Sequence, residues 1–160
     1  MNNELIAAYG NFANRILTFV NRRFDGSLKG FNPKLDPEVV KHVESAYEKV
    51  SEKVEEISFQ DALKELMKLP RFSNKYIDDQ KPWESIKSDK DKCAEAMFNG
   101  LYILNNLRIL TYPFLPFSSA RLSKQLGVGE VSPKESLDQW KPVEWDPDRV
   151  ISKEISPLIL

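Results

Sequence analysis

The chain has 160 residues, of which 41% are hydrophobic and 29% charged, with one cysteine and a formal net charge of −1. This length and composition fit one soluble globular domain whose core needs no disulfide or metal ion. The near-neutral charge argues against a stand-alone nucleic-acid binder, which normally carries a basic excess. Any RNA contact must therefore be local, or be assisted by another domain.

The single cysteine and the single histidine, Cys93 and His42, are far apart in the sequence. They predict neither a zinc site nor a thiol–histidine pair, and one cysteine suits a reducing compartment. The apolar runs are only a few residues long, and the first residues lack the pattern of a signal peptide. We therefore expect a cytoplasmic protein with no membrane partner.

Residues 3–24 predict a first long helix, because their apolar positions recur at helical spacing. These positions include Tyr9, Phe12, Ile16, Phe19 and Val20. Polar positions spaced four, three and four residues apart form one stripe on the other face: Asn11, Arg15, Thr18 and Arg22.

Local signals predict the bounds of the next two helices. Asp36 caps a second helix that has Pro37 at its first position. Residues 58–61 resemble a capping box and open a third helix. We expect Pro70 to bend this third helix without ending its apolar pattern, and Pro82 to end it.

Charged residues around 88–92 lead into a fourth helix, which is marked by apolar positions from Ala94 to Thr111 and is predicted to be the central and most buried one. A short fifth helix runs from about Ser118 to Leu126 and ends at Gly127. Large apolar residues of the following tail indicate that it packs on something: Trp140, Trp145, Ile151, Ile155 and Leu158. With no strand of useful length, the fold class is an all-α antiparallel bundle of about five helices at 1–127, with an extended C-terminal tail at 128–160.

Catalytic motifs are missing from the sequence. It has no glycine-rich phosphate loop, no nucleophile elbow, and no carboxylate–histidine arrangement with suitable spacing. We therefore expect no catalytic residue in this chain. Asp78 and Asp79 are adjacent on the third helix and point in different directions, which makes a divalent-metal site improbable. Solvation, or tethering of a nearby arginine or lysine, is the simpler interpretation.

A proline and a tryptophan, Pro82 and Trp83, follow the third helix. The proline limits backbone freedom, so an exposed indole here would already be ordered when it stacks on a base. Asn11 and Arg15, one helical turn apart, carry groups that suit base edges. Together these residues predict a surface for single-stranded RNA. Two plainer alternatives stay open: a tryptophan that plugs the core, and an ordinary polar helix face.

Several cations are candidates for neutralising phosphates. They are Arg22, Arg23, Lys29 and Lys75.

Five segments resemble, in order and in spacing, the anticodon-binding domain of methionyl-tRNA synthetase, a class I aminoacyl-tRNA synthetase. They are Asn-Phe-Ala-Asn-Arg at 11–15, Asn-Arg-Arg-Phe-Asp-Gly at 21–26, Asn-Lys-Tyr at 74–76, Asp-Gln-Lys-Pro-Trp at 79–83, and Leu-Thr-Tyr-Pro-Phe-Leu-Pro at 110–116. The resemblance runs from about residue 3 to 127. Related synthetases share the segment before the tryptophan, and its combination with Asn11 and Arg15 points to methionine.

The resemblance implies that Asn11, Arg15 and Trp83 recognise the CAU anticodon of methionine tRNA. The indole would stack on an unstacked anticodon base while the polar pair reads base edges. Three further residues are expected to belong to this tRNA anticodon-binding site, Asn14, Asn74 and Pro82, with Arg22 and Lys75 as weaker phosphate contacts. The expected partners are the tRNA(Met) anticodon loop and the protein's own N-terminal catalytic domain, and neither DNA nor a membrane.

The tail also resembles the family's C-terminal segment, which folds back toward the catalytic part. Residues 155–158 carry that resemblance, and Ile159 stands where the family has an aromatic residue.

The chain lacks the His-x-Gly-His-like and Lys-Met-Ser-Lys-Ser-like signatures of the class I catalytic domain, and it has no zinc-ligand set. The resemblance therefore implies a non-catalytic fragment of a methionine–tRNA ligase. No cofactor is expected in this fragment, and ATP, magnesium, methionine and zinc would belong to the missing N-terminal portion. The alternatives are an anticodon-binding domain of another class I synthetase, and a helical protein-interaction scaffold with no RNA role.

Overall fold

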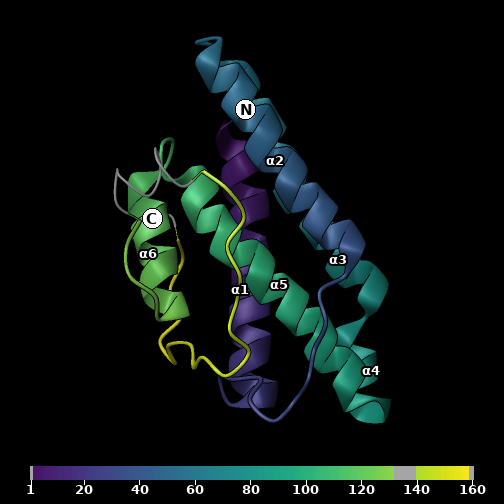
Figure 1. Ribbon diagram of the computed structural model, residues 1–160. Helices are drawn as coiled ribbons and strands as arrows, with labels where there is room; N and C mark the ends of the chain where they lie inside the picture. Colours follow the sequence, from purple (N-terminus) through teal and green to yellow (C-terminus); the bar gives the residue numbers. More distant parts are fainter. Residues whose placement is uncertain (1, 132–139, 159–160) are drawn as a thin grey trace.

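The computed structural model describes residues 2–131 and 140–158, with side chains from Ile6 onward. Within these ranges the fold is all-α, as predicted, and no strand is present (Figure 1). The helices are α1 (Asn2–Phe24), α2 (Pro37–Glu55), α3 (Phe59–Gln80), α4 (Pro82–Ser88), α5 (Lys90–Thr111) and α6 (Pro116–Leu126). The short helix α4 is an addition to the predicted elements. None of the described helices is long and apolar enough to cross a membrane.

Helices α2 and α3 begin where the sequence predicts, but only α2 has the predicted side-chain cap. The Asp36 carboxylate accepts a hydrogen bond from the Glu38 backbone N–H at 2.9 Å, as an N-cap does. The capping box predicted at 58–61 is wrong in its bonding. The Ser58 hydroxyl donates to the Asp61 carboxylate at 2.6 Å, and no side-chain bond caps the backbone there.

Helix α3 continues through Pro70 and stops at Gln80. Lys81 takes a left-handed conformation (φ 50°), and its N–H donates to the Ile77 carbonyl at 3.1 Å. Pro82 then occupies the first turn of α4, a position that needs no backbone donor. Pro82 thus lies just past the end of one helix and at the start of the next.

Helix α5 is the central helix, as predicted. It contacts each of the other major helices and α4, and Figure 1 shows it crossing the middle of the bundle. Gly100 lets α1 approach it closely, because a Cβ there would lie 2.6 Å from the Ile16 Cδ1 atom. The core is therefore built on α5.

The described part of the tail packs on the bundle, which confirms the prediction made from its large apolar residues. Trp145, Ile151 and Leu158 are each less than 5% exposed. Figure 1 shows the segment after residue 140 running along α5 and then turning back toward α6. Docking of the tail toward a catalytic domain stays a prediction, and Ile159 lies outside the described residues.

Two buried amides of α5 hold the tail. The Asn106 side chain donates to the Val143 carbonyl at 3.0 Å and accepts from the Val143 N–H at 2.8 Å, so it pairs with this residue as a neighbouring strand would. The Asn105 side chain donates to the Glu144 carbonyl at 2.8 Å. The tail therefore belongs to the same packed unit as the helices.

Candidate nucleic-acid interface

Arg15 projects from α1 toward α3, where two side chains fix its guanidinium. Its Nη2 atom donates to the Asp78 carboxylate at 2.6 Å, and its Nη1 atom donates to the Asn74 Oδ1 atom at 3.3 Å. The Arg15 side chain is still 34% exposed. The tethering role that the sequence allowed for Asp78 is confirmed.

Asn74 supports Arg15 from behind and joins α3 to α1. Its amide group donates to the Ala8 carbonyl of α1 and to the Pro70 carbonyl of its own helix, both at 3.1 Å. Its oxygen accepts from Arg15. With every polar atom of its side chain engaged, Asn74 positions the arginine.

Trp83 lies in the first turn of α4 and is 45% exposed. The prediction of an exposed indole is confirmed, and Trp83 does not plug the core. Trp83 follows α3, as expected, and the structure adds that it stands on the first turn of a further short helix. The Pro82 ring beneath it is buried.

A hydrogen bond connects the backbone that precedes Trp83 to α5. The Cys93 thiol, which is buried, donates to the Pro82 carbonyl at 3.4 Å. Burial raises the pKa of this thiol, so that it stays protonated and able to donate. Together with the fixed φ of proline and the left-handed Lys81, this bond leaves the indole little backbone freedom.

Arg15 and Trp83 line the same groove, which we call the Trp83 groove. It lies between α1 and the α3–α4 junction and has a volume of about 360 Å³. Its described lining contains three arginines and no Asp or Glu: Asn14, Arg15, Ile16, Thr18, Phe19, Arg22, Arg23, Ile77, Pro82, Trp83 and Met97. The arrangement offers an aromatic face, hydrogen-bond donors and positive charge on one surface.

Four of the predicted site residues besides these two have clear positions relative to the groove. Asn14 and Pro82 line it, and the Asn14 Oδ1 atom accepts a hydrogen bond from Thr18 at 3.4 Å. Asn11 is exposed one turn before Arg15 on α1 but does not line the groove. Asn74 acts through Arg15.

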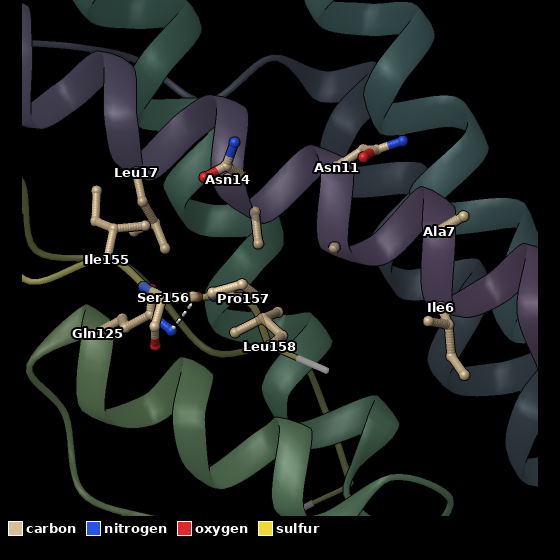
Figure 2. A pocket seen from close by; sticks show the side chains of 12 residues that line it. Ile6, Ala7, Asn11, Asn14, Leu17, Gln125, Ile155, Ser156, Pro157 and Leu158 are labelled. Atoms are coloured by element: carbon tan, nitrogen blue, oxygen red, sulfur yellow. Dashed lines mark hydrogen bonds between the residues drawn. The ribbon is translucent and has the colours of Figure 1, made fainter. Parts of the chain in front are cut away.

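Asn11 and Asn14 also border a second depression, between α1 and residues 155–158 of the tail. Figure 2 shows both amide groups pointing away from the tail, on the far side of the helix from Pro157. Their polar groups are therefore turned toward solvent and not toward the packed tail.

The predicted phosphate contacts separate into two groups. Arg22 lines the groove, and so does Arg23 beside it. Lys75 is exposed on α3 outside the groove lining. The sequence alone could not make this division, because it depends on how α1 faces the α3–α4 junction.

No group of three or more His, Cys, Asp or Glu side chains in the described part of the chain could hold a metal ion.

A family model described as the anticodon binding domain of methionyl tRNA ligase matches residues 29–142. The chain is 37% identical over 150 residues to a methionine–tRNA ligase of Bacillus mycoides (strain KBAB4), covering 93% of this chain and 26% of that protein. A methionine–tRNA ligase of Bacillus anthracis (strain CDC 684 / NRRL 3495) is 35% identical over 158 residues, which cover 98% of this chain and 27% of the relative. The chain thus spans about a quarter of the length of these curated relatives.

Solved structures show the same fold. The free state of Mycobacterium tuberculosis methionyl-tRNA synthetase aligns with a TM-score of 0.84 at 20% identity, over 98% of this chain and 32% of that one. The form bound by methionyl-adenylate also aligns with a TM-score of 0.84 at 20% identity, over 99% of this chain and 32% of that one. The six-helix arrangement with its folded-back tail is therefore shared with these larger proteins.

Proposed function

Because the chain belongs to the family of anticodon-binding domains of methionyl-tRNA ligases, we propose that it binds the anticodon loop of methionine tRNA as part of a longer, cytoplasmic ligase. Attachment of methionine to the tRNA would take place in the catalytic portion, with ATP, magnesium and zinc bound there. The role of this chain is selection of the tRNA by its CAU anticodon.

The observation that carries this proposal is the pairing of an exposed indole with a fixed arginine in one groove. Trp83 is 45% exposed, and the Pro82 carbonyl that precedes it accepts a hydrogen bond from the Cys93 thiol. Stacking of a base on an aromatic side chain contributes about 1–3 kcal/mol and does not depend on base identity. Trp83 therefore supplies affinity for an unstacked base, and neighbouring groups must supply selectivity.

Arg15 is suited to that selectivity. Asp78 balances its charge, and Asn74 fixes the orientation of its fork. A guanidinium held in this way offers directed donors to a base edge and little general attraction for phosphates. The exposed amides of Asn11 and Asn14 lie on the same helix and add both donors and acceptors.

The test is a titration of the chain, at stated salt, with two anticodon stem-loops. One carries CAU and the other has a changed first anticodon base. We expect the CAU loop to bind more tightly, and Arg15→Ala to reduce the ratio of the two affinities. The matched control Lys29→Ala also removes an exposed cation, but outside the groove lining, and should leave that ratio unchanged.

The outcomes distinguish the alternatives. Equal binding of both loops by the wild-type chain would sink specific anticodon recognition. Binding of neither loop would favour a helical protein-interaction scaffold. A stronger preference for the changed loop would point to a synthetase for another amino acid.

A further inference from the structure

The Trp83 groove carries more positive charge than the reading of one base requires. Arg22 and Arg23 lie in the last turn of α1 and line the groove beside Arg15 and Trp83. Both are exposed. They belong to one wall, since Arg22 continues the stripe of α1 on which Arg15 and Thr18 lie.

The three arginines differ in what balances them. Arg15 forms an ion pair with Asp78 at 2.6 Å. Within residues 2–131 and 140–158, neither Arg22 nor Arg23 has a hydrogen-bond or ion-pair partner. The groove therefore holds two uncompensated cations next to an exposed aromatic face, in a protein whose net charge is −1. That local excess fits an anionic ligand that also has a flat apolar face.

We propose that the Trp83 groove holds a whole nucleotide unit of single-stranded RNA, with the base on the Trp83 indole and a phosphodiester on the guanidinium groups of Arg22 and Arg23. This inference rests on the proposed function and names a second subsite within it. Seven residues of α-helix separate Arg15 from Arg22, which is about 10 Å along the axis. Arg15 can therefore contact a base edge while Arg22, further along the same helix, contacts a phosphate. The forked donors of arginine match phosphate oxygens.

A structural explanation of Arg22 and Arg23 makes a different prediction. Basic side chains in the last turn of a helix interact favourably with its macrodipole, whatever else they do. The chain offers a matched control, because Lys124 is exposed in the last turn of α6, outside the groove lining. Removing its charge also takes a cation from the last turn of a helix, one charge where the double variant removes two, but leaves the groove intact.

The experiment measures the affinity of the CAU stem-loop over a series of salt concentrations for three proteins. These are the wild type, the double variant Arg22→Gln/Arg23→Gln, and Lys124→Gln. Each phosphate contact to a single strand contributes about −0.7 to the slope of log K against log salt. Because one phosphate is proposed to lie on both guanidinium groups, we expect the double variant to bind with a slope shallower by about 0.7, and Lys124→Gln to keep the wild-type slope. Circular dichroism checks that all three remain helical.

A second measurement locates the contact on the RNA. A neutral methylphosphonate with a 2′-O-methyl sugar replaces each anticodon phosphate in turn. At one position this replacement should weaken binding to the wild type, but cause no further loss in the double variant. Such a result shows that the arginines and that phosphate act together.

The two proposals fail in different ways. If the wild type prefers the CAU loop while the double variant keeps the wild-type salt slope, the phosphodiester subsite is wrong and anticodon recognition stands. If the wild type binds both loops equally, the proposed function fails. A double variant that loses preference for CAU, with an unchanged salt slope, would assign Arg22 and Arg23 to base reading and overturn the subsite.

Discussion

Replacing Trp83 by alanine tests whether this residue serves RNA binding or the stability of the fold. The other two tryptophans of the chain, Trp140 and Trp145, serve as controls. Stacking on an aromatic side chain contributes about 1–3 kcal/mol. Since 1.4 kcal/mol corresponds to a tenfold change in affinity, Trp83→Ala should weaken binding of the CAU loop by about 5- to 140-fold. Trp83→Phe keeps an aromatic face and should recover much of this loss.

The cost to stability follows from exposure. Truncating a buried tryptophan to alanine costs about 3–5 kcal/mol. Trp83 is already 45% exposed, so about half of that, roughly 2 kcal/mol, is expected. Trp145 is 3% exposed and should lose the full amount when replaced by alanine. Urea unfolding followed by circular dichroism measures both values.

The reasoning is refuted if Trp83→Ala destabilises the chain as much as Trp145→Ala does. It is equally refuted if Trp83→Ala binds the CAU loop as tightly as the wild type while remaining folded. Trp140→Ala, at a half-buried indole that donates to the Tyr47 carbonyl at 2.9 Å, gives the baseline for removing a tryptophan far from the groove. Its loop affinity should not change.

Three further changes test other parts of the structure. Asp78→Asn removes the charge that balances Arg15, so it should strengthen binding of both stem-loops, by less than about tenfold because the ion pair is exposed. In a titration, the ratio of the affinities for the CAU loop and the changed loop should fall. Asn106→Leu leaves the Tyr47 hydroxyl and the backbone of the tail without partners, so it should cost about 3 kcal/mol or more in urea unfolding and speed proteolysis after residue 140. Burial raises the pKa of Tyr9 and Tyr47 well above the ordinary value, so these hydroxyls ionise first in the unfolded chain. Their contribution to stability should be constant below about pH 10 and fall above it. Urea unfolding at pH 9 and pH 11 measures this fall, and Tyr9→Phe should reduce it.

The helix bounds could be predicted because they depend on neighbouring residues. Asp36 with Pro37, and Gly127 with its left-handed φ of 73°, act within one turn of the helix end that they define. Helix α4 escaped prediction because it has only 7 residues, too few to show a period. As a signal for helix bounds, its first residue, Pro82, predicts the end of α3 but not the start of a further helix.

Contacts between distant segments could be predicted less well. Asp78 meets Arg15 across 63 positions of sequence, and helical spacing says nothing about which face of α3 turns toward α1. The same limit applies to Asn106, a buried polar residue whose partner lies in the tail. Trp83 could be selected only because Pro82 before it made an ordered, exposed ring physically reasonable.

The charges of this domain indicate that, in a longer protein, it would contribute selectivity for the RNA while another part contributes affinity. Net charge is −1, and Asp78 compensates one of the three arginines in the groove. We therefore expect the general attraction for RNA to be weak, and we expect contacts in the groove to distinguish one loop from another more than they hold any loop tightly. In the full ligase that we propose, a second contact with the same tRNA would raise affinity through effective concentration and leave this groove free to select. Tethering the chain to any second RNA-binding module should then raise affinity for the CAU loop and the changed loop by the same factor.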